Sequence, residues 1–142
     1  MLRSKLLRMS DLVIFACVHN AGRSQMAAAF FNRLANPAKA TAVSAGTQPA
    51  DRVHPIVVEA MKEEGLDVAG NRPRRLTDDL ARRASLLITM GCGDECPIVP
   101  GLMRDDWLLD DPKDRSLADV RLIRNAIRER VSALISNRHW NG

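Results

Sequence analysis

The chain has 142 residues, of which 46% are hydrophobic and 27% charged, and these values suit one globular domain with a single hydrophobic core. The net charge of +4 slightly favours an anionic substrate, whereas the 4% of aromatic residues and the absence of tyrosine argue against a nucleic-acid stacking surface. No apolar run is long enough to span a bilayer and the basic start lacks a signal-peptide pattern, so we expect a cytoplasmic protein that does not bind membranes.

Strand and helix patterns alternate along the chain. Short runs rich in Val, Ile, Leu and Phe predict buried strands, and apolar residues at helical spacing predict helices. In chain order we expect a strand at 11–18, a helix at 24–35, a strand at 41–46, helices at 55–64 and 78–83, a strand at 85–90, a short strand within 105–112 and a last helix from Ser116 to the end. Pro55, Thr77 and Ser116 are typical of helix starts. This order favours an α/β domain with a parallel sheet and right-handed crossovers.

The three cysteines are Cys17, Cys92 and Cys96, an odd number that a purely structural disulfide framework would not use up. In a reducing compartment, thiols are more often catalytic, metal-binding or redox-active than structural. Zinc binding by Cys92 and Cys96 with a histidine is an alternative. However, zinc sites usually have four ligands at recognisable spacing, and the chain has no second pair, so we expect no metal.

Candidate functional residues follow the predicted strands. Cys17 ends the first strand, the cysteine loop at 91–96 follows the third, and Asp110 and Asp111 follow the fourth. Parallel sheets bind ligands beyond the carboxyl ends of their strands. We therefore expect these three segments to share one edge of the sheet.

The segment "FACVHNAGRSQM", residues 15–26, connects a strand to a helix and contains the strongest functional signal. Backbone N–H groups and the positive end of a helix dipole at such a loop attract a tetrahedral oxyanion, and they stabilise a thiolate at Cys17. The planar guanidinium of Arg23 could hold two oxyanion oxygens. A cysteine and an arginine six residues apart are equally consistent with an active site and with a buried, inert cysteine beside a surface arginine. The other residues of the loop distinguish these two interpretations.

Three polar or small residues complete the loop. Gly22 permits a tight or positive-φ backbone, and Asn20 tolerates left-handed geometry and can tie the loop together through its side chain. Ser24 could donate a hydrogen bond to the Cys17 thiolate. With the strand–loop–helix context, these residues favour a functional site.

The motif "CVHNAGRS" resembles the C-x-x-N-x-x-R-S loop of low-molecular-weight protein tyrosine phosphatases and of the arsenate reductases built on the same fold. The segments "SAGT" (44–47), "ITMGCGDECPIVPG" (88–101) and "WLLDDP" (107–112) are similar to the arsenate reductase branch that uses thioredoxin. The resemblance covers about residues 11–138. It implies a three-layer αβα fold with a four-stranded parallel sheet, and a role in arsenic detoxification.

The phosphatase branch is the alternative. Those enzymes usually carry a second cysteine just before the loop arginine, where this chain has Gly22, and their aspartate loop is typically followed by tyrosines, which are absent here. Arsenate reduction instead consumes two electrons and needs further thiols, which Cys92 and Cys96 can supply.

The resemblance implies a three-cysteine relay. Cys17 attacks arsenic while Asp111 protonates the leaving oxygen; Cys92 then attacks Cys17 and releases arsenite; Cys96 attacks Cys92, and thioredoxin reduces the final disulfide. The family pattern often places the second cysteine directly after the third strand, whereas Gly91 intervenes here. Asp110 is expected to support the turn only.

Substrate binding is assigned to the loop by the same resemblance. Asn20, Gly22, Arg23 and Ser24 are expected to hold arsenate, with phosphate and sulfate as competing oxyanions. Some relatives bind a monovalent cation through a glutamate that corresponds to Ala28, so no such site is expected here. We expect no cofactor.

The domain organisation follows from these patterns. We expect a flexible N-terminal extension at 1–10, a single catalytic domain at 11–138 and a C-terminal tail at 139–142, acting as a monomer. Met9 is a second possible start of translation.

Overall fold

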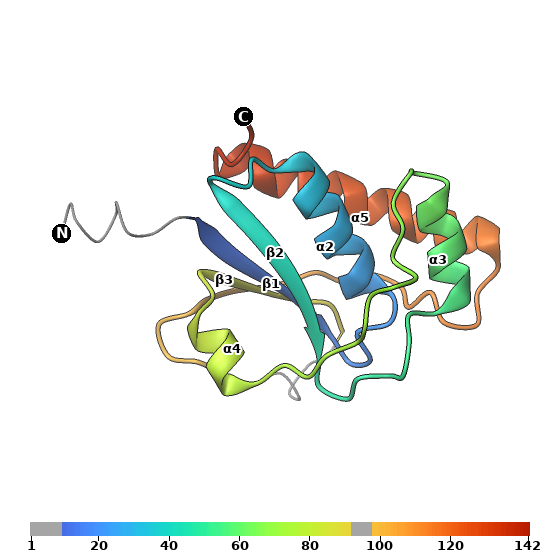
Figure 1. Cartoon of the computed structure of the whole chain (residues 1–142), viewed down its shortest axis with the longest axis horizontal. Coiled ribbons are helices and arrows are strands. Elements are labelled where there is room, and N and C mark those ends of the chain that lie inside the picture. The colour runs from blue at the N-terminus through green and yellow to red at the C-terminus, as the bar shows by residue number, and fades with distance from the viewer. Residues whose placement is uncertain (1–9, 92–97) are drawn as a thin grey trace.

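A computed structural model describes residues 10–91 and 98–142 of the chain. Its elements, labelled in Figure 1, are β1 (Asp11–Cys17), α2 (Arg23–Leu34), β2 (Ala40–Gly46), α3 (Pro55–Lys62), α4 (Asp78–Arg82), β3 (Leu86–Thr89), β4 (Met103–Asp106) and α5 (Leu117–Asn137). Each expected helix is present, and the caps at Thr77 and Ser116 are confirmed by side-chain oxygens that accept N–H bonds from Leu80 and Asp119. Within the described ranges, no helix is both long and apolar enough to cross a membrane.

The four strands form one sheet in the order β2-β1-β3-β4, and every neighbouring pair is parallel. The predicted α/β class with a four-stranded parallel sheet is thereby confirmed. β1 lies between β2 and β3: the crossover from β1 to β2 passes through α2 in one layer, and the chain then returns past β1 to β3 through α4 in the other layer. The carboxyl end of β1 is therefore the switch point at which such sheets bind ligands.

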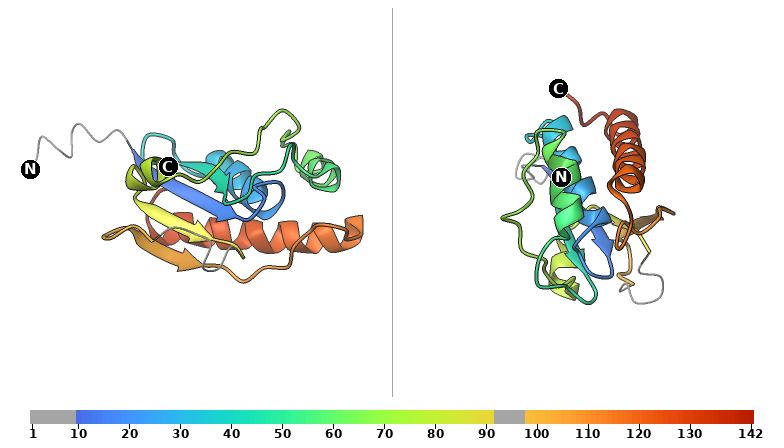
Figure 2. Two further views of the ribbon diagram at one scale, coloured as in Figure 1. Left: turned by 90° about the horizontal axis from the view of Figure 1, so that it is seen from below. Right: turned by 90° about the vertical axis from the view of Figure 1, so that its right-hand side faces the viewer.

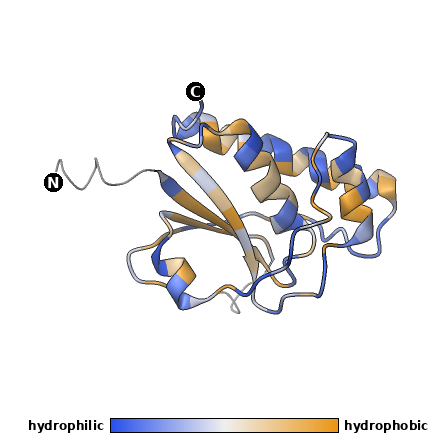
Figure 3. Ribbon diagram, viewed as in Figure 1, coloured by the Kyte–Doolittle hydropathy of each residue, from blue (hydrophilic) through white to orange (hydrophobic). Residues whose placement is uncertain are grey.

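Side chains of β1 alternate between two apolar layers, as the pleat of a strand requires. Val13, Phe15 and Cys17 belong to the core formed with α2, α3 and α5, whereas Ile14 and Ala16 belong to the core formed with α4. Figure 1 shows these helices around the sheet, and Figure 2 shows α5 running beside α2. The strand is coloured as hydrophobic along most of its length in Figure 3. The Cys17 side chain thus faces the α2 and α5 layer.

Aromatic side chains fill the larger core. Phe15 packs against Phe31 and Trp107 with ring centroids 5.9 and 5.6 Å apart, and Phe31 packs against Trp140 at 5.7 Å. Trp107 directly follows the fourth strand and is buried. Trp140, within the expected C-terminal tail, is only 7% exposed and belongs to the same core.

The fourth strand differs from the expectation in position and character. It covers Met103–Asp106, so it begins two residues before the expected window 105–112, and all four of its residues are exposed. β4 is an edge strand, and charged side chains such as Arg104 are common on edges because they discourage pairing with other chains.

Candidate active site

The loop between β1 and α2 starts at Cys17, whose residue is buried with 3% of its surface exposed. Successive carbonyl groups of the loop all accept hydrogen bonds from outside it. Cys17, Val18, His19 and Ala21 accept from the backbone N–H groups of Thr47, Gln48, Ala50 and His54, and Asn20 accepts from the Gln25 side chain. The segment 47–54 therefore holds the outer side of the loop.

The backbone N–H groups of residues 18–24 donate no hydrogen bond within the described part of the chain. Buried N–H groups are almost always paired in folded proteins, so a run of free donors at a helix start is a site for an anion or water. The helix dipole of α2 adds a positive field at the same place. The loop therefore has the donors that a tetrahedral oxyanion needs.

Two polar side chains of the loop contact each other and the thiol. The Ser24 hydroxyl oxygen lies 2.9 Å from Cys17 Sγ, and Asn20 Nδ2 donates to Ser24 Oγ at 2.8 Å. Asn20 has a φ of 51°, so the expected left-handed geometry and the expected side-chain link are both confirmed.

Of the two reasons expected for Gly22, a tight or a positive-φ backbone, the structure excludes the second. The φ of Gly22 is −137°, so no left-handed backbone is involved. A Cβ at this position would lie 2.7 Å from Cγ of Pro112 and 3.6 Å from Cδ2 of His54. Glycine therefore lets Pro112 pack against the loop. A cysteine here, as in the phosphatase pattern, would displace Pro112.

Gly46, in the "SAGT" motif, has an equally direct role. A Cβ there would lie 2.6 Å from the carbonyl oxygen of Val18 and 2.9 Å from the backbone nitrogen of Asn20. The absence of a side chain lets β2 lie against the loop. The motif is thus part of the structure that shapes the anion site.

Arg23 reaches across the edge of the sheet to the segment after β4. Its side chain is 12% exposed, Nη1 donates to the Leu109 carbonyl at 3.0 Å, and Nη2 lies 3.7 Å from Asp111 Oδ2. A Cβ on Gly91 would lie 2.7 Å from Arg23 Nη1, and Gly91 has a φ of 93°. The glycine that follows β3 in this chain thus makes room for the arginine.

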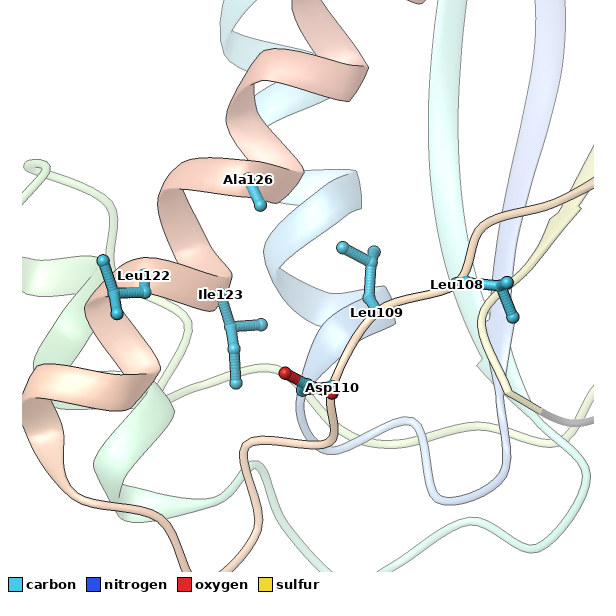
Figure 4. A pocket seen from close by; sticks show the side chains of 6 residues that line it. All are labelled: Leu108, Leu109, Asp110, Leu122, Ile123 and Ala126. Carbon is cyan, nitrogen blue, oxygen red and sulfur yellow. The ribbon is translucent and has the colours of Figure 1, made fainter.

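The structure brings Asp111, not Asp110, into the turn and toward the loop. Asp111 Oδ1 accepts from the backbone N–H of Lys113 at 3.0 Å, so the expectation that Asp110 supports this turn is wrong. Asp110 instead lines a surface groove with Leu109, Ile123 and other apolar residues, as Figure 4 shows. The segment after β4 thus separates the two carboxylates, with Asp111 beside Arg23.

Two histidines lie near the loop. His19 Nδ1 is 3.1 Å from the Gln48 carbonyl oxygen. Burial lowers the pKa of His54, although the nearby Asp111 carboxylate opposes this shift. Burial therefore favours the neutral form of His54. Its place beside Gly22 has no local sequence signal, because it depends on the fold of the segment 47–54.

Cys92 and Cys96 lie outside the described residues. Among the residues that the structure does describe, no group of three or more His, Cys, Asp and Glu side chains could hold a metal ion. A thiol beside a hydroxyl donor, free amide donors and a guanidinium can attack a tetrahedral oxyanion and stabilise the charge that develops. This chemistry fits both phosphoryl transfer and arsenate reduction.

Comparison with known proteins identifies the family and members of it that are similar to this chain. Residues 12–139 match the family described as low molecular weight phosphotyrosine protein phosphatase. A putative arsenate reductase of Halobacterium salinarum is 40% identical over 121 residues, which cover 82% of this chain and 85% of that protein. The glutaredoxin arsenate reductase of Synechocystis is 35% identical over 127 residues, with 87% and 95% covered.

Solved structures agree with this comparison. The thioredoxin-dependent arsenate reductase of Corynebacterium glutamicum superimposes with a TM-score of 0.79 at 38% identity and covers 95% of this chain. This chain spans 65% of the length of that protein. An arsenate reductase of Archaeoglobus fulgidus gives a TM-score of 0.74 at 31% identity over 87% of this chain and 98% of its own. The sequence match, the parallel sheet and the loop at Cys17 together place the chain in the low molecular weight phosphotyrosine protein phosphatase family.

Proposed function

We propose that this chain is an arsenate reductase that converts arsenate to arsenite with its own thiols and is regenerated by a thioredoxin. The observation that carries the proposal is the Cys17 thiol at the base of an anion-binding loop, in a chain that has two further cysteines. The relatives named as arsenate reductases support the same substrate.

Arsenate is held by the N–H groups of the loop and by Arg23. Residues Asn20, Gly22 and Ser24 contribute backbone donors, and the Ser24 hydroxyl stabilises the Cys17 thiolate. The thiolate forms a bond to arsenic as an As–O bond breaks. Asp111, beside Arg23, gives a proton to the departing oxygen, which leaves as water. Phosphate and sulfate have the same shape and compete for the loop.

Two electrons then pass from sulfur to arsenic. The Cys92 thiolate attacks Cys17 Sγ, the S–As bonding pair moves to arsenic, and arsenite leaves as a disulfide forms between Cys17 and Cys92. Cys96 attacks Cys92, frees the Cys17 thiol and leaves a Cys92–Cys96 disulfide for thioredoxin to reduce. Every protein group in the cycle before thioredoxin belongs to one chain. A monomer without a cofactor, in the reducing cytoplasm, is therefore sufficient.

A steady-state assay tests the reaction. Arsenate should drive NADPH oxidation in the presence of thioredoxin and thioredoxin reductase, while hydrolysis of p-nitrophenyl phosphate stays weak. A chain that hydrolyses the phosphate ester efficiently and consumes no NADPH with arsenate is a phosphatase, the second candidate that the family match supports.

Replacing Arg23 with lysine should lower kcat/KM for arsenate by about 10²–10³, the usual effect of removing one preorganised donor to a developing oxyanion. Lysine keeps the charge but cannot reproduce the planar fork of the guanidinium. The matched control is Arg33→Lys on the same helix, where the guanidinium donates to the carbonyls of Glu64 and Gly65 away from the loop. If Arg23→Lys and Arg33→Lys had the same kcat/KM for arsenate, Arg23 would not contribute to the site.

Replacing Cys96 with serine tests the order of the relay. This variant should complete about one turnover and stop as a Cys17–Cys92 disulfide, because the buried Cys17 sulfur is poorly accessible to a protein reductant. The disulfide can be mapped by mass spectrometry after stoichiometric arsenate and alkylation of free thiols. Many turnovers with both Cys17 and Cys92 free would contradict the order and make Cys96 dispensable.

A further inference from the structure

Asn20, at the centre of the loop, has a left-handed backbone, and the buried side-chain amide of Gln25 holds it in place. Gln25 has no part in the proposed reaction. Asn20 is fully buried at a φ of 51°, a conformation that costs a non-glycine residue free energy and persists only where the surroundings hold it. Gln25, on the first turn of α2, is 3% exposed. Its Nε2 donates to the Asn20 backbone oxygen at 3.0 Å and lies 3.3 Å from Asn20 Oδ1.

Backbone groups determine the orientation of each amide in this cluster. The Asn20 carbonyl oxygen can only accept, so Gln25 must turn its nitrogen toward it. The Gln25 oxygen then faces Asn71, whose Nδ2 donates to it at 3.1 Å. The backbone N–H of Arg74 donates to Asn20 Oδ1 at 3.0 Å, so the Asn20 nitrogen must face Ser24.

The Ser24 hydroxyl connects this cluster to the Cys17 thiol. Ser24 Oγ accepts from Asn20 Nδ2, so the hydroxyl proton of Ser24 is free to point along the 2.9 Å contact to Cys17 Sγ. The hydrogen bonds therefore run in one direction, from Asn71 and Gln25 on one side and Arg74 on the other, through Asn20 and Ser24 to the sulfur. A donor of this kind stabilises the thiolate over the thiol.

We infer that Gln25 is a positioning residue for the Cys17 thiol: it holds Asn20 in its left-handed conformation and so directs the Ser24 hydroxyl at the sulfur. Gln25 contacts neither the sulfur nor the expected place of the oxyanion, and it acts only through Asn20. The reactivity of the thiol depends on this arrangement whether the substrate is arsenate or a phosphate ester.

The matched comparison lies on the same helix. Asn32, seven residues after Gln25 on α2, also uses a side-chain amide to hold backbone: it donates to the Ala42 carbonyl at 2.9 Å and accepts from the Ala42 N–H at 2.8 Å. Asn32→Met removes an amide anchor of α2 without touching the loop. A loss of stability alone should therefore appear in both variants, whereas a change in thiol reactivity should appear only at position 25.

The experiment uses the full chain with Cys92 and Cys96 replaced by alanine, so that Cys17 is the only thiol. Iodoacetamide alkylation is followed as a function of pH for the parent, Gln25→Met and Asn32→Met. Gln25→Met should react about tenfold more slowly at pH 7, the effect of weakening one hydrogen bond to a charged group, and its pH profile should move to higher pH. Asn32→Met should keep the parent profile.

A second variant covers the case in which Gln25→Met does not fold. Asn71→Asp changes an exposed side chain and places a carboxylate oxygen against Gln25 Oε1, so it should slow alkylation by about two- to threefold. Parent-like profiles for every folded variant at positions 25 and 71 would overturn the inference, as would equal changes in Gln25→Met and Asn32→Met. Because alkylation needs neither arsenate nor thioredoxin, this result is independent of the proposed function.

Discussion

Cys17→Ser should abolish arsenate reduction, with a fall in kcat of at least about 10⁴-fold, the scale seen when a covalent nucleophile is removed. A serine hydroxyl does not ionise near neutral pH, and its oxygen cannot form the disulfide that releases arsenite. The measurement is arsenate-dependent NADPH oxidation with thioredoxin and its reductase. Hydrolysis of p-nitrophenyl phosphate should be lost in the same variant, because both reactions need the nucleophile.

Phosphate binding shows whether Cys17→Ser is inactive because it lacks the nucleophile or because it does not fold. The free loop N–H groups and Arg23 remain in Cys17→Ser, so the variant should still bind phosphate and melt cooperatively. Turnover near the wild-type rate would show that the thiol at the base of the loop is not the nucleophile.

Cys92→Ala should end catalytic reduction of arsenate and leave phosphate ester hydrolysis unchanged. Ester hydrolysis needs the thiol, the arginine and an acid, whereas reduction needs a second thiol to take the Cys17 sulfur from arsenic. The two activities of one preparation are compared, so each serves as the control for the other. Sustained turnover of arsenate by Cys92→Ala with thioredoxin would contradict the relay and point to a small-thiol reductant.

Local signals explain how much of the site is predictable from the sequence. Cys17 ends a continuous apolar strand, and α2 begins within one residue of the expected start, so the strand–loop–helix unit is readable within one short segment. Asn20 and Ser24 act within the same segment, and their predicted geometry is confirmed. These contacts span at most seven residues of sequence.

Long-range contacts explain most of what the sequence does not predict. Gly22 looks like a residue chosen for backbone freedom, but its role depends on Pro112, ninety residues further along the chain. Gln25 belongs to an apparently ordinary first turn of a helix, and the donor to its side-chain oxygen is Asn71, a distant residue in the sequence. Neither partner can be identified before the sheet order brings the segments together.

The sequence pattern of the edge strand β4 is weak for a different reason. Three of the four β4 residues are charged, and all four, including Met103, are exposed, so neither apolar alternation nor a buried run marks the strand. The hydrophobic residues that attract attention, from Trp107 to Leu109, come after it. In the segment that follows, Asp111 and not Asp110 accepts the hydrogen bond of the turn.

A single-turnover measurement of arsenite tests the central claim most directly. Fully reduced protein is mixed with an excess of arsenate in the absence of thioredoxin, and arsenite and free thiols are quantified after rapid quenching. The relay predicts about one arsenite released and two thiols lost per chain, since two electrons reduce one As(V) and produce one disulfide. Unchanged thiols and no arsenite, in protein that hydrolyses a phosphate ester, would contradict it and assign the chain to the phosphatases.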